Sequence, residues 1–302
     1  MKTALLFSGQ GAQHVGMGKS IYNNIEHVRR YWDCADEILG FGLKEIAFNG
    51  PEESLVDTSV CQPALYVHGY SIFKTLQKLG KLDNLTAALG LSLGELTALA
   101  VAEVFDFEAG LRIVAERGRL MQEACKATDG AMASLIGGTP ELVMDLCAQC
   151  DVDMANINCP GQIVISGERV KIEEACNKAK EMAFSRVIPL KVAGAYHSRL
   201  MRSAADSFGE FLAEIEFKAP KLIVFTNTTG KSIEDPKEIK KALVRQVVSS
   251  VLWEDCMQNL AQLGIVDFFE CGPGKVLTGL ARRINKDWVV RPVSEFSDLE
   301  SL

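Results

Sequence analysis

The sequence predicts an α/β protein whose main sheet is mostly parallel, with a smaller domain inserted into the larger one. Two observations lead to this prediction. Strand-like apolar runs alternate with helix-like segments at both ends of the chain, which is typical of a layered fold with a parallel sheet. Between them, residues 129–194 follow the order strand, helix, strand, strand, helix, strand, which is the ferredoxin-like pattern. We therefore assign residues 1–128 and 195–302 to the large domain and residues 129–194 to the inserted one.

Composition and charge narrow the classes of function. The chain has 302 residues, enough to bury a large core, with 48% hydrophobic and 24% charged residues, as in an ordinary soluble globular protein. Its formal net charge of -7 argues against nucleic acid as a partner, and no apolar run is long enough to span a membrane. The nine cysteines are scattered and odd in number, which indicates reduced thiols and a cytoplasmic protein. Cys147 and Cys150 form the single C-x-x-C pair, so we interpret their spacing as chance and expect no metal site.

Residues 1–79 are expected to form a strand, a glycine-rich loop and several helices. The strand is Thr3–Phe7, and because Gly9 ends its apolar run we interpret it as a strand and not a signal peptide. The glycine-rich loop, residues 8–13, can bring backbone N–H groups close to an anion, but it lacks the G-x-G-x-x-G spacing of a dinucleotide site. Helices are predicted over residues 19–48 and over Cys61–Leu79, with Pro63 in the first turn of the second.

A serine between two glycines lies where a predicted strand meets a predicted helix. The strand is Leu85–Leu89, the helix is Leu96–Val101, and the sequence between them is Gly90-Leu91-Ser92-Leu93-Gly94, which fits the G-x-S-x-G nucleophile elbow. Such a turn is too tight for side chains at the flanking positions. It exposes the serine hydroxyl at a helix N-terminus, where free N–H groups favour negative charge. Ser92 is therefore the candidate nucleophile, although a simple turn can show the same pattern.

The arginines of the predicted helix Phe107–Cys125 are of two kinds. Arg112 and Arg119 have glutamates one helical turn away, which is typical of solvated surface arginines. Arg117 instead has apolar residues at these positions. Because a buried unpaired charge is costly, Arg117 needs an anion from elsewhere. That anion is either a distant acidic side chain or a substrate carboxylate held by both arms of the guanidinium.

Strands and helices continue to alternate in the rest of the chain. The predicted elements of the inserted domain are strand Ala131–Ile136, helix Pro140–Cys150, strand Val152–Ile157, strand Gln162–Ser166, helix Lys171–Met182 and strand Arg186–Val192. Those of the resumed large domain are helix 199–214, strand Leu222–Phe225, helices 236–248 and Trp253–Leu263, strand Val266–Phe269, a helix from Lys275 and a short strand, Val289–Val290.

A serine nucleophile needs a base, and the sequence has four histidines. His27 and His68 lie inside predicted helices, and His14 follows the glycine-rich loop. His197 is the best candidate, because it lies at a loop-to-helix junction downstream of the serine, which is the chain order of α/β-hydrolase-type enzymes. We therefore expect an α/β-hydrolase-like large domain. No spacing singles out the acid that would orient His197 among the downstream residues Asp255, Asp267 and Glu270.

Several short motifs along the chain form one ordered set. They are Phe7-Ser8-Gly9-Gln10-Gly11-Ala12-Gln13, Gln62-Pro63-Ala64, Gly90-x-Ser92-Leu93-Gly94-Glu95, Arg117-Gly118, Asn158-Cys159-Pro160-Gly161-Gln162, Tyr196-His197-Ser198 and Glu270-Cys271-Gly272-Pro273-Gly274. With this ordered set, the sequence resembles the malonyl-CoA:acyl carrier protein transacylases of fatty acid synthesis nearly from end to end.

This resemblance implies roles for individual residues. Ser92 would be the acylated nucleophile, and His197 its general base and then general acid. The main-chain carbonyl of Gln246 would orient His197 in place of an aspartate. The other implied roles are an oxyanion hole made by the backbone N–H groups of Gln10 and Leu93, a contact to the malonyl carboxylate from Arg117 with Gln62 beside it, and the lining of the cleft by Asn156 and Asn158.

The sequence departs from the family pattern at two places beside the acyl pocket. The residue before the nucleophile, usually histidine in the family, is Leu91 here. The loop before His197, residues 193–196, lacks the proline-containing form that the family leads us to expect. Both departures leave the acyl selectivity open more than they affect the type of reaction.

The resemblance therefore implies transfer of a malonyl group from malonyl-CoA to the phosphopantetheine thiol of acyl carrier protein, through a malonyl-serine and without a cofactor. Three alternatives stay open: a serine hydrolase or thioesterase on the same elbow, a non-catalytic subunit that docks a carrier protein, and a related acyltransferase of polyketide or polyunsaturated fatty acid synthesis. We expect a cytoplasmic monomer with neither nucleic acid nor membrane as a partner. Basic residues near the cleft should meet an acidic carrier protein, and the candidates are Lys191, Arg199 and Arg202.

Overall fold

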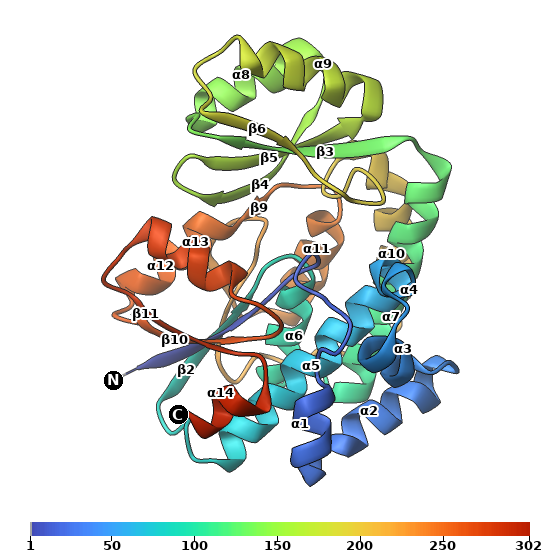
Figure 1. Cartoon of the computed structure of the whole chain (residues 1–302), viewed down its shortest axis with the longest axis vertical. Helices are drawn as coiled ribbons and strands as arrows, with labels where there is room; N and C mark the ends of the chain where they lie inside the picture. The colour runs from blue at the N-terminus through green and yellow to red at the C-terminus, as the bar shows by residue number, and fades with distance from the viewer. Residues whose placement is uncertain (1) are drawn as a thin grey trace.

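Two β-sheets organise the computed structural model, which describes residues 2–302 (Figure 1). Six strands form the first sheet, in the lower part of the view, and all pair in parallel except β8, which pairs antiparallel with β7. In order across the sheet, they are β11 (Val289–Val293), β10 (Asp267–Cys271), β1 (Thr3–Phe7), β2 (Leu85–Gly90), β7 (Ile223–Phe225) and β8 (Ser232–Ile233). The predicted α/β fold with a mainly parallel sheet is therefore confirmed.

Helices cover both faces of this sheet, because its central strands carry apolar side chains on both faces. Along β1, Leu5 and Phe7 pack against one group of helices, whereas Ala4 and Leu6 pack against another. The first group includes α2 (Glu26–Leu39), α5 (Thr58–Lys78), α6 (Leu93–Val101), α7 (Phe107–Ala127) and α10 (Arg202–Ala213). The second group is α12 (Trp253–Gln262) and α13 (Val276–Ile284).

The second sheet lies above the first in Figure 1 and contains the strands of the segment 129–194. Its order is β6 (Arg186–Pro189), β3 (Gly130–Ile136), β5 (Gln162–Glu168), β4 (Asp153–Cys159) and β9 (Val251–Leu252). The first four pair antiparallel, and α8 (Pro140–Cys150) and α9 (Arg169–Lys180) connect them in the predicted order. The fifth strand, β9, comes from outside the segment and pairs in parallel with β4. The pairing of β9 with β4 thus joins the segment 129–194 to the rest of the chain, in addition to the two points where the chain enters and leaves that segment.

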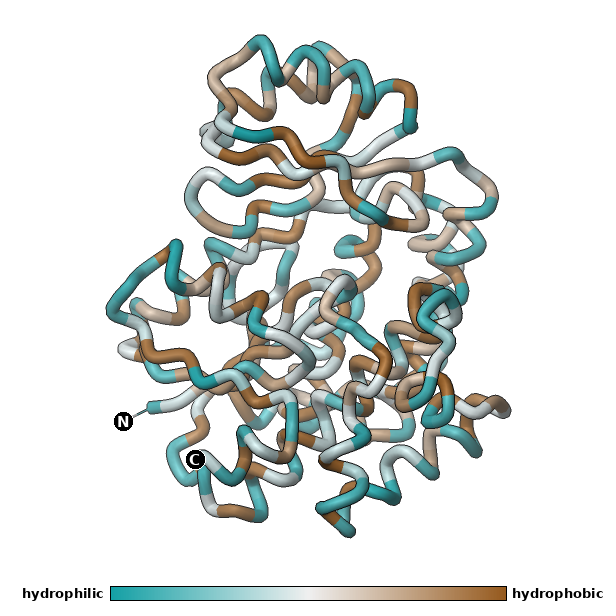
Figure 2. Tube along the Cα trace, viewed as in Figure 1, coloured by the Kyte–Doolittle hydropathy of each residue, from teal (hydrophilic) through white to brown (hydrophobic). Residues whose placement is uncertain are grey.

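Helices α8 and α9 cover one face of the second sheet, and the other face turns toward the first sheet. Ala133 and Leu135 of β3 pack with the two helices, whereas Met132 packs with residues of the large core below. Figure 2 shows hydrophilic residues along the outer turns of α8 and α9, at the top of the view. The lower face of the second sheet is therefore available as a wall of a site between the sheets.

The remaining helices are shorter or lie at the periphery. They are α1 (Lys19–Asn24), α3 (Leu43–Asn49), α4 (Glu52–Val56), α11 (Pro236–Gln246), α14 (Phe296–Glu300) and a single 3-10 turn, Arg199–Met201. Across residues 2–302, none of the helices combines the length and apolar character needed to cross a membrane.

Two helices begin three residues earlier than predicted: α6 begins at Leu93 and not at Leu96, and α5 also begins early. Helix α5 begins at Thr58 and not at Cys61, because Asp57 caps it by accepting a hydrogen bond from the N–H of Ser59. Pro63 consequently lies inside the helix and not in its first turn. The sequence does not predict β8, β9, α4 or α14, because elements of two to five residues are too short to show a period.

Candidate active site

The turn between β2 and α6 holds Ser92 in a strained backbone conformation. Ser92 is the N-cap residue of α6, with φ 54° and ψ -104°, a region that residues with a side chain rarely occupy. A Cβ atom at Gly90 would lie 1.8 Å from the carbonyl carbon of Gly94, and one at Gly94 would lie 2.1 Å from the carbonyl oxygen of Phe7. Both glycines are therefore required by the close approach of the chain to itself, as expected for a nucleophile elbow.

Ser92 and His197 are in direct contact, although they lie 105 residues apart in the chain. Ser92 Oγ lies 2.7 Å from His197 Nε2, and His197 Nδ1 lies 2.7 Å from the main-chain oxygen of Gln246. Because a carbonyl oxygen can only accept, Nδ1 carries the ring proton and Nε2 is free to accept the proton of Ser92. The three residues thus have the arrangement expected of a nucleophile, a base and a group that orients the base.

The guanidinium of Arg117 lies beside this pair and is 2% exposed. Its Nη1 donates to Gln62 Oε1 at 2.8 Å, and its Nη2 donates to Gln246 Oε1 at 2.9 Å and to Ser92 Oγ at 3.1 Å. In the described part of the chain no carboxylate forms an ion pair with Arg117, whereas the exposed Arg119 on the same helix pairs with two glutamates. The helix therefore carries both kinds of arginine that its sequence predicts.

Glu95 is the acidic side chain whose charge attracts Arg117, and it is 3% exposed. The Gln246 side chain lies between them: its Nε2 donates to Glu95 Oε2 at 2.7 Å, and its Oε1 accepts from Arg117. Burial raises the pKa of Glu95 to about 7, although hydrogen bonds from Asn227 and Gln246 oppose this shift. Burial lowers the pKa of Arg117 to about 10, against the attraction of Glu95. A distant acid thus compensates the guanidinium only in part, without a direct ion pair in the described chain.

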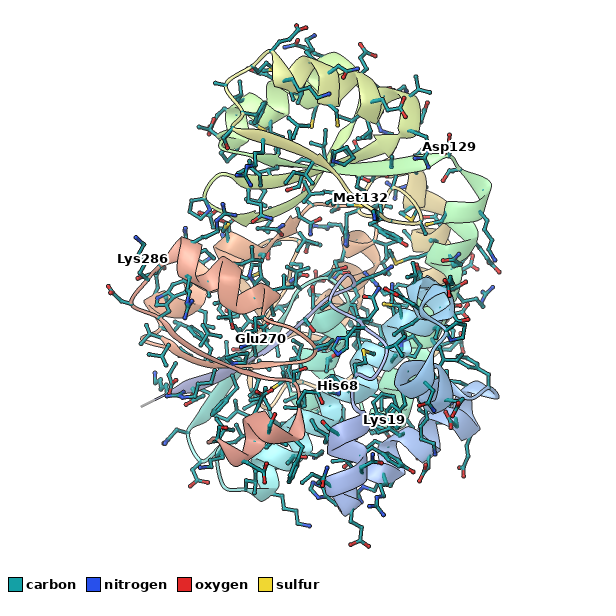
Figure 3. All side chains as sticks on the ribbon, viewed as in Figure 1. Lys19, His68, Asp129, Met132, Glu270 and Lys286 are labelled. Atoms are coloured by element: carbon teal, nitrogen blue, oxygen red, sulfur yellow. The ribbon has the colours of Figure 1, made fainter. Side chains whose placement is uncertain are left out.

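A cavity of about 230 Å³ between the two sheets is lined by both Ser92 and His197. Its apolar wall includes Leu91, Leu280 and Met132, the last of which is labelled on β3 in Figure 3. The other residues predicted at the site that line this cavity are Gln10, Gln62, Leu93, Asn156 and Asn158. Arg117 and Gln246 lie behind this lining and reach it through their hydrogen bonds to Ser92 and Gln62.

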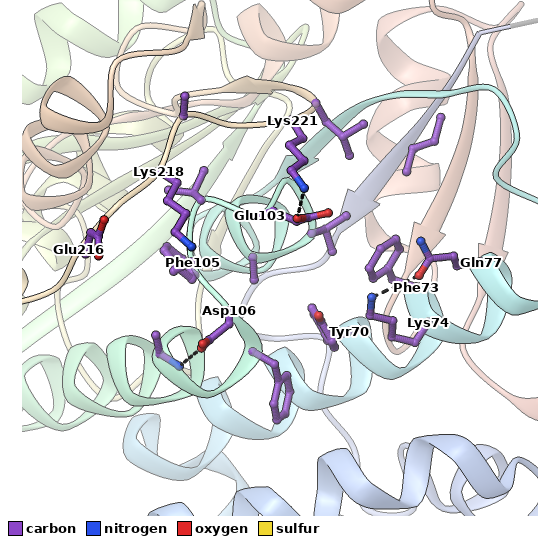
Figure 4. A pocket seen from close by; sticks show the side chains of 18 of the residues that line it. Tyr70, Phe73, Lys74, Gln77, Glu103, Phe105, Asp106, Glu216, Lys218 and Lys221 are labelled. Atoms are coloured by element: carbon purple, nitrogen blue, oxygen red, sulfur yellow. Dashed lines mark hydrogen bonds and ion pairs between the residues drawn. The ribbon is translucent and has the colours of Figure 1, made fainter.

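A larger hollow of about 760 Å³ lies elsewhere, beside α5 and the segment 215–222 (Figure 4). Its lining contains neither a histidine nor a serine or cysteine. Some of its charged groups are already engaged, since Lys221 pairs with Glu103 and Asp106 accepts from the N–H of Ala109 at the start of α7. The larger hollow therefore lacks a pair like the Ser92 and His197 of the smaller one.

The other titratable candidates lie away from Ser92. His14 is half exposed and lies 3.9 Å from a glutamate near the C-terminus. Asp255 is exposed on α12, Asp267 pairs with an arginine of β11, and Glu270 accepts from backbone N–H groups at the start of α13. The structure therefore brings His197 to the serine, and a main-chain carbonyl in place of an acid orients it.

Comparison with known proteins decides the family. The family model described as "Acyl transferase domain" matches residues 4–291. The chain belongs to the acyl transferase family. It is 36% identical over 304 residues to the "Malonyl CoA-acyl carrier protein transacylase" of Staphylococcus aureus (strain MRSA252), covering 99% of this chain and 97% of the relative. It is 37% identical to the protein of the same name from Bacillus subtilis (strain 168), covering 99% and 95%.

Solved structures of acyltransferases agree with this assignment. An acyl carrier protein S-malonyltransferase from Vibrio cholerae has a TM-score of 0.95 at 38% identity, covering 100% of this chain and 99% of the other. A malonyl-transacylase solved in complex with a type II PKS acyl-carrier protein has a TM-score of 0.96 at 35% identity, covering 100% and 98%. The family resemblance in the sequence is therefore confirmed, and the chain is an acyltransferase.

Sequence reasoning missed two buried residues of this acyltransferase site. Asn227 follows β7, and its Oδ1 accepts a hydrogen bond from the N–H of Ser92 at 2.7 Å. Loop residues of this kind show no period, so nothing in the sequence singled it out. Glu95 follows Ser92 by three residues, a spacing that is typical of a capping box. The structure shows no such cap, because Glu95 accepts instead from the N–H of Asn227 and from Gln246.

The pH dependence of acylation should report the environment of His197. Burial, and after it the charge of Arg117, lowers the pKa of His197 from 6.5 to about 4, although the Gln246 carbonyl opposes the shift. Only a neutral imidazole can take the Ser92 proton. We therefore expect the acylation rate of this acyltransferase to stay level as the pH falls through 6.5 and to drop only near 4.

Rapid-quench acylation across this pH range measures the rate directly. Samples returned to neutral pH before assay separate titration of the base from unfolding. In Arg117→Ala the acid limb should move to higher pH, because the second cause of the shift is removed. A wild-type rate that is halved near pH 6.5 would show that the pKa of His197 is not lowered in the folded protein.

Proposed function

We propose that this acyltransferase transfers the malonyl group of malonyl-CoA to the phosphopantetheine thiol of acyl carrier protein through a malonyl ester on Ser92. The observation that carries the proposal is the position of Ser92 Oγ, 2.7 Å from His197 Nε2 and 3.1 Å from the Arg117 guanidinium. One oxygen thus faces both a base and a guanidinium that forms no ion pair within residues 2–302. A thioester that also carries a free carboxylate matches both groups.

In the first half-reaction, Ser92 Oγ attacks the thioester carbonyl while His197 Nε2 takes its proton. The tetrahedral intermediate then collapses, the C–S bond breaks, and the imidazolium donates the proton to the departing CoA thiolate. In the second half-reaction, the phosphopantetheine thiol attacks the malonyl-serine ester while His197 takes the thiol proton. The bond between the acyl carbon and Ser92 Oγ then breaks, and the same proton passes to Ser92 Oγ. The two steps form a ping-pong cycle in which neither a cofactor nor a metal takes part.

The backbone N–H groups of Gln10 and Leu93 are proposed to hold the oxyanion. Both residues line the cavity, and Leu93 opens α6, where the first N–H groups have no acceptor within the helix. The Gln10 loop is held in place by its side chain, which donates to Thr58 Oγ1 and to Tyr196 Oη at 3.3 Å each. Loss of one such donor typically costs roughly 3 kcal/mol of barrier.

Arg117 is proposed to bind the malonyl carboxylate, with its guanidinium fixed by the hydrogen bond from Nη1 to Gln62, which lines the cavity. The Nη2 group already donates to Gln246 and to Ser92 Oγ, so the carboxylate would replace the contact to Oγ that faces the cavity. Asn156 and Asn158 would border the acyl group from β4, and Leu91 would contact it with an apolar side chain where the family usually has a histidine.

Several further assignments belong to the same proposal. The first sheet and its helices form an α/β-hydrolase-like domain of residues 1–128 and 195–302, and residues 129–194 form an inserted ferredoxin-like domain. The enzyme works as a cytoplasmic monomer. Lys191 borders the cavity and is a candidate contact for an acidic carrier protein. Arg202 is exposed, whereas Arg199 is already paired with two aspartates and is the weaker candidate.

Intact-mass analysis of both proteins tests this function. The enzyme is incubated with malonyl-CoA, freed of CoA, and then mixed with acyl carrier protein that carries phosphopantetheine. We expect a malonyl-enzyme that survives in buffer and passes its acyl group to the carrier, but not to a carrier without phosphopantetheine. Loss of the group to water would instead indicate a thioesterase, and absence of an adduct would indicate a docking subunit. Parallel runs with acetyl- and methylmalonyl-CoA measure the acyl selectivity, which Leu91 leaves open.

A further inference from the structure

Asn227 uses every one of its polar groups at the nucleophile elbow or beside it. It is 1% exposed and lies in the loop that follows β7. Its Oδ1 accepts from the N–H of Ser92 at 2.7 Å, and its Nδ2 donates to the carbonyl of Gly90 at 2.9 Å. Its own N–H donates to Glu95 Oε2 at 3.0 Å, and its carbonyl accepts from the N–H of Leu252 in β9 at 2.8 Å.

The elbow needs support from outside itself. Ser92 holds φ 54° and ψ -104°, and His197 also has a positive φ of 58°, so neither backbone conformation is favoured locally. Strand β2 ends at Gly90 and helix α6 begins after Ser92, where the first N–H groups lack acceptors within the helix. The planar amide of Asn227 supplies one acceptor and one donor at this junction and spans the two residues on either side of Leu91.

Only an amide of this length satisfies both contacts. A carboxylate of the same shape could accept from Ser92 but could not donate to Gly90. It would also place a second negative charge near Glu95. Both side chains lie close to the same nitrogen, Gln246 Nε2, which is 3.4 Å from Asn227 Oδ1 and 2.7 Å from Glu95 Oε2. The orientation of the amide is therefore fixed by its neighbours.

We propose that Asn227 is a positioning residue for acyl transfer, whose amide holds the elbow at the angle that presents Ser92 Oγ to His197 Nε2. This inference rests on the proposed function. Both half-reactions use the same oxygen, so Asn227 affects both. Asn227 neither bonds to Arg117 nor lines the cavity, so it leaves the preference for a carboxylate-bearing acyl group unchanged.

The test is rapid-quench acylation by malonyl-CoA, read by intact mass, for Asn227→Asp and Asn227→Ala. A misplaced reacting group can cost about 10²-fold in rate, and we expect the first-order rate constant to fall by about that factor in both variants. The final fraction of enzyme acylated should stay at the wild-type level. The ratio of malonyl to acetyl transfer should also stay the same. A merely structural role would do the opposite, lowering the acylated fraction and keeping the rate constant of the folded molecules.

Asn259→Ala is the matched control. The Asn259 amide donates to the carbonyl of Gly230 at 2.9 Å and so supports the same loop without reaching the elbow. We expect the Asn259→Ala rate constant to stay close to that of wild type, because the contact that it loses is to Gly230 and not to the elbow. A wild-type rate constant in Asn227→Asp, or an equal loss in Asn259→Ala, would overturn the inference. If the wild-type enzyme forms no malonyl adduct at all, the proposed function fails, which is a distinguishable result.

Discussion

Replacing His197 by alanine should lower the rate of Ser92 acylation by roughly 10⁴-fold, the upper end of what a positioned general base contributes. The reason is geometric. His197 Nε2 lies 2.7 Å from Ser92 Oγ, and in the described chain no other histidine or carboxylate contacts that oxygen. Without a base, the serine hydroxyl is a weak nucleophile. Single-turnover acylation by malonyl-CoA, followed by intact mass, measures the effect.

His14→Ala is the matched control for this variant. His14 is the other histidine near a loop of the site in the sequence, yet the structure places it at the surface beside Glu295. Its removal should leave the acylation rate close to that of wild type, because its side chain lies beside Glu295 and does not contact Ser92. If His14→Ala and His197→Ala lost activity equally, or if His197→Ala kept it, the assignment of the base would be wrong.

Arg117→Ala should reverse the acyl preference of the enzyme while Ser92 remains acylable. A guanidinium that binds a carboxylate contributes charge-assisted hydrogen bonds of about 1.5–3 kcal/mol each, and two of them correspond to roughly 10²-fold or more in the malonyl-to-acetyl ratio. The wild-type enzyme should handle acetyl-CoA poorly, because acetyl leaves the buried charge unpaired. The measurement is kcat/KM for malonyl- and acetyl-CoA in parallel.

Two further variants serve as controls for this prediction. Arg119→Ala removes an exposed arginine from the same helix, one already paired with glutamates, and should leave the ratio unchanged. Arg117→Lys keeps a charge but loses the planar fork, so its ratio should lie between those of alanine and wild type. A malonyl preference that survives in Arg117→Ala would mean that another group holds the carboxylate.

That Ser92, His197 and the buried Arg117 belong to one candidate site could be predicted because each leaves a local pattern in the sequence. The glycines of the elbow are dictated by backbone contacts shorter than any Cβ atom allows, and Arg117 differs from Arg119 in its neighbours one turn away. Element bounds followed from period and turn residues, with errors where a cap at Asp57 started α5 early.

What the sequence could not predict are contacts made by groups without a pattern. The partner of His197 is a backbone carbonyl, which every residue has, so only the family resemblance pointed to Gln246. Asn227 acts from a loop, and β9 pairs with β4 through two residues. Such contacts depend on the relative placement of distant segments, which local periodicity does not encode.

The most direct test of this account is to locate the acyl group after the enzyme has met malonyl-CoA. Peptide mapping of the quenched enzyme should find one malonyl group, on Ser92 in the peptide between β2 and α6. The adduct should be absent from Ser92→Ala and should leave the wild-type enzyme when acyl carrier protein is added. A malonyl group found on any other residue, or an adduct that persists in Ser92→Ala, would contradict the central claim.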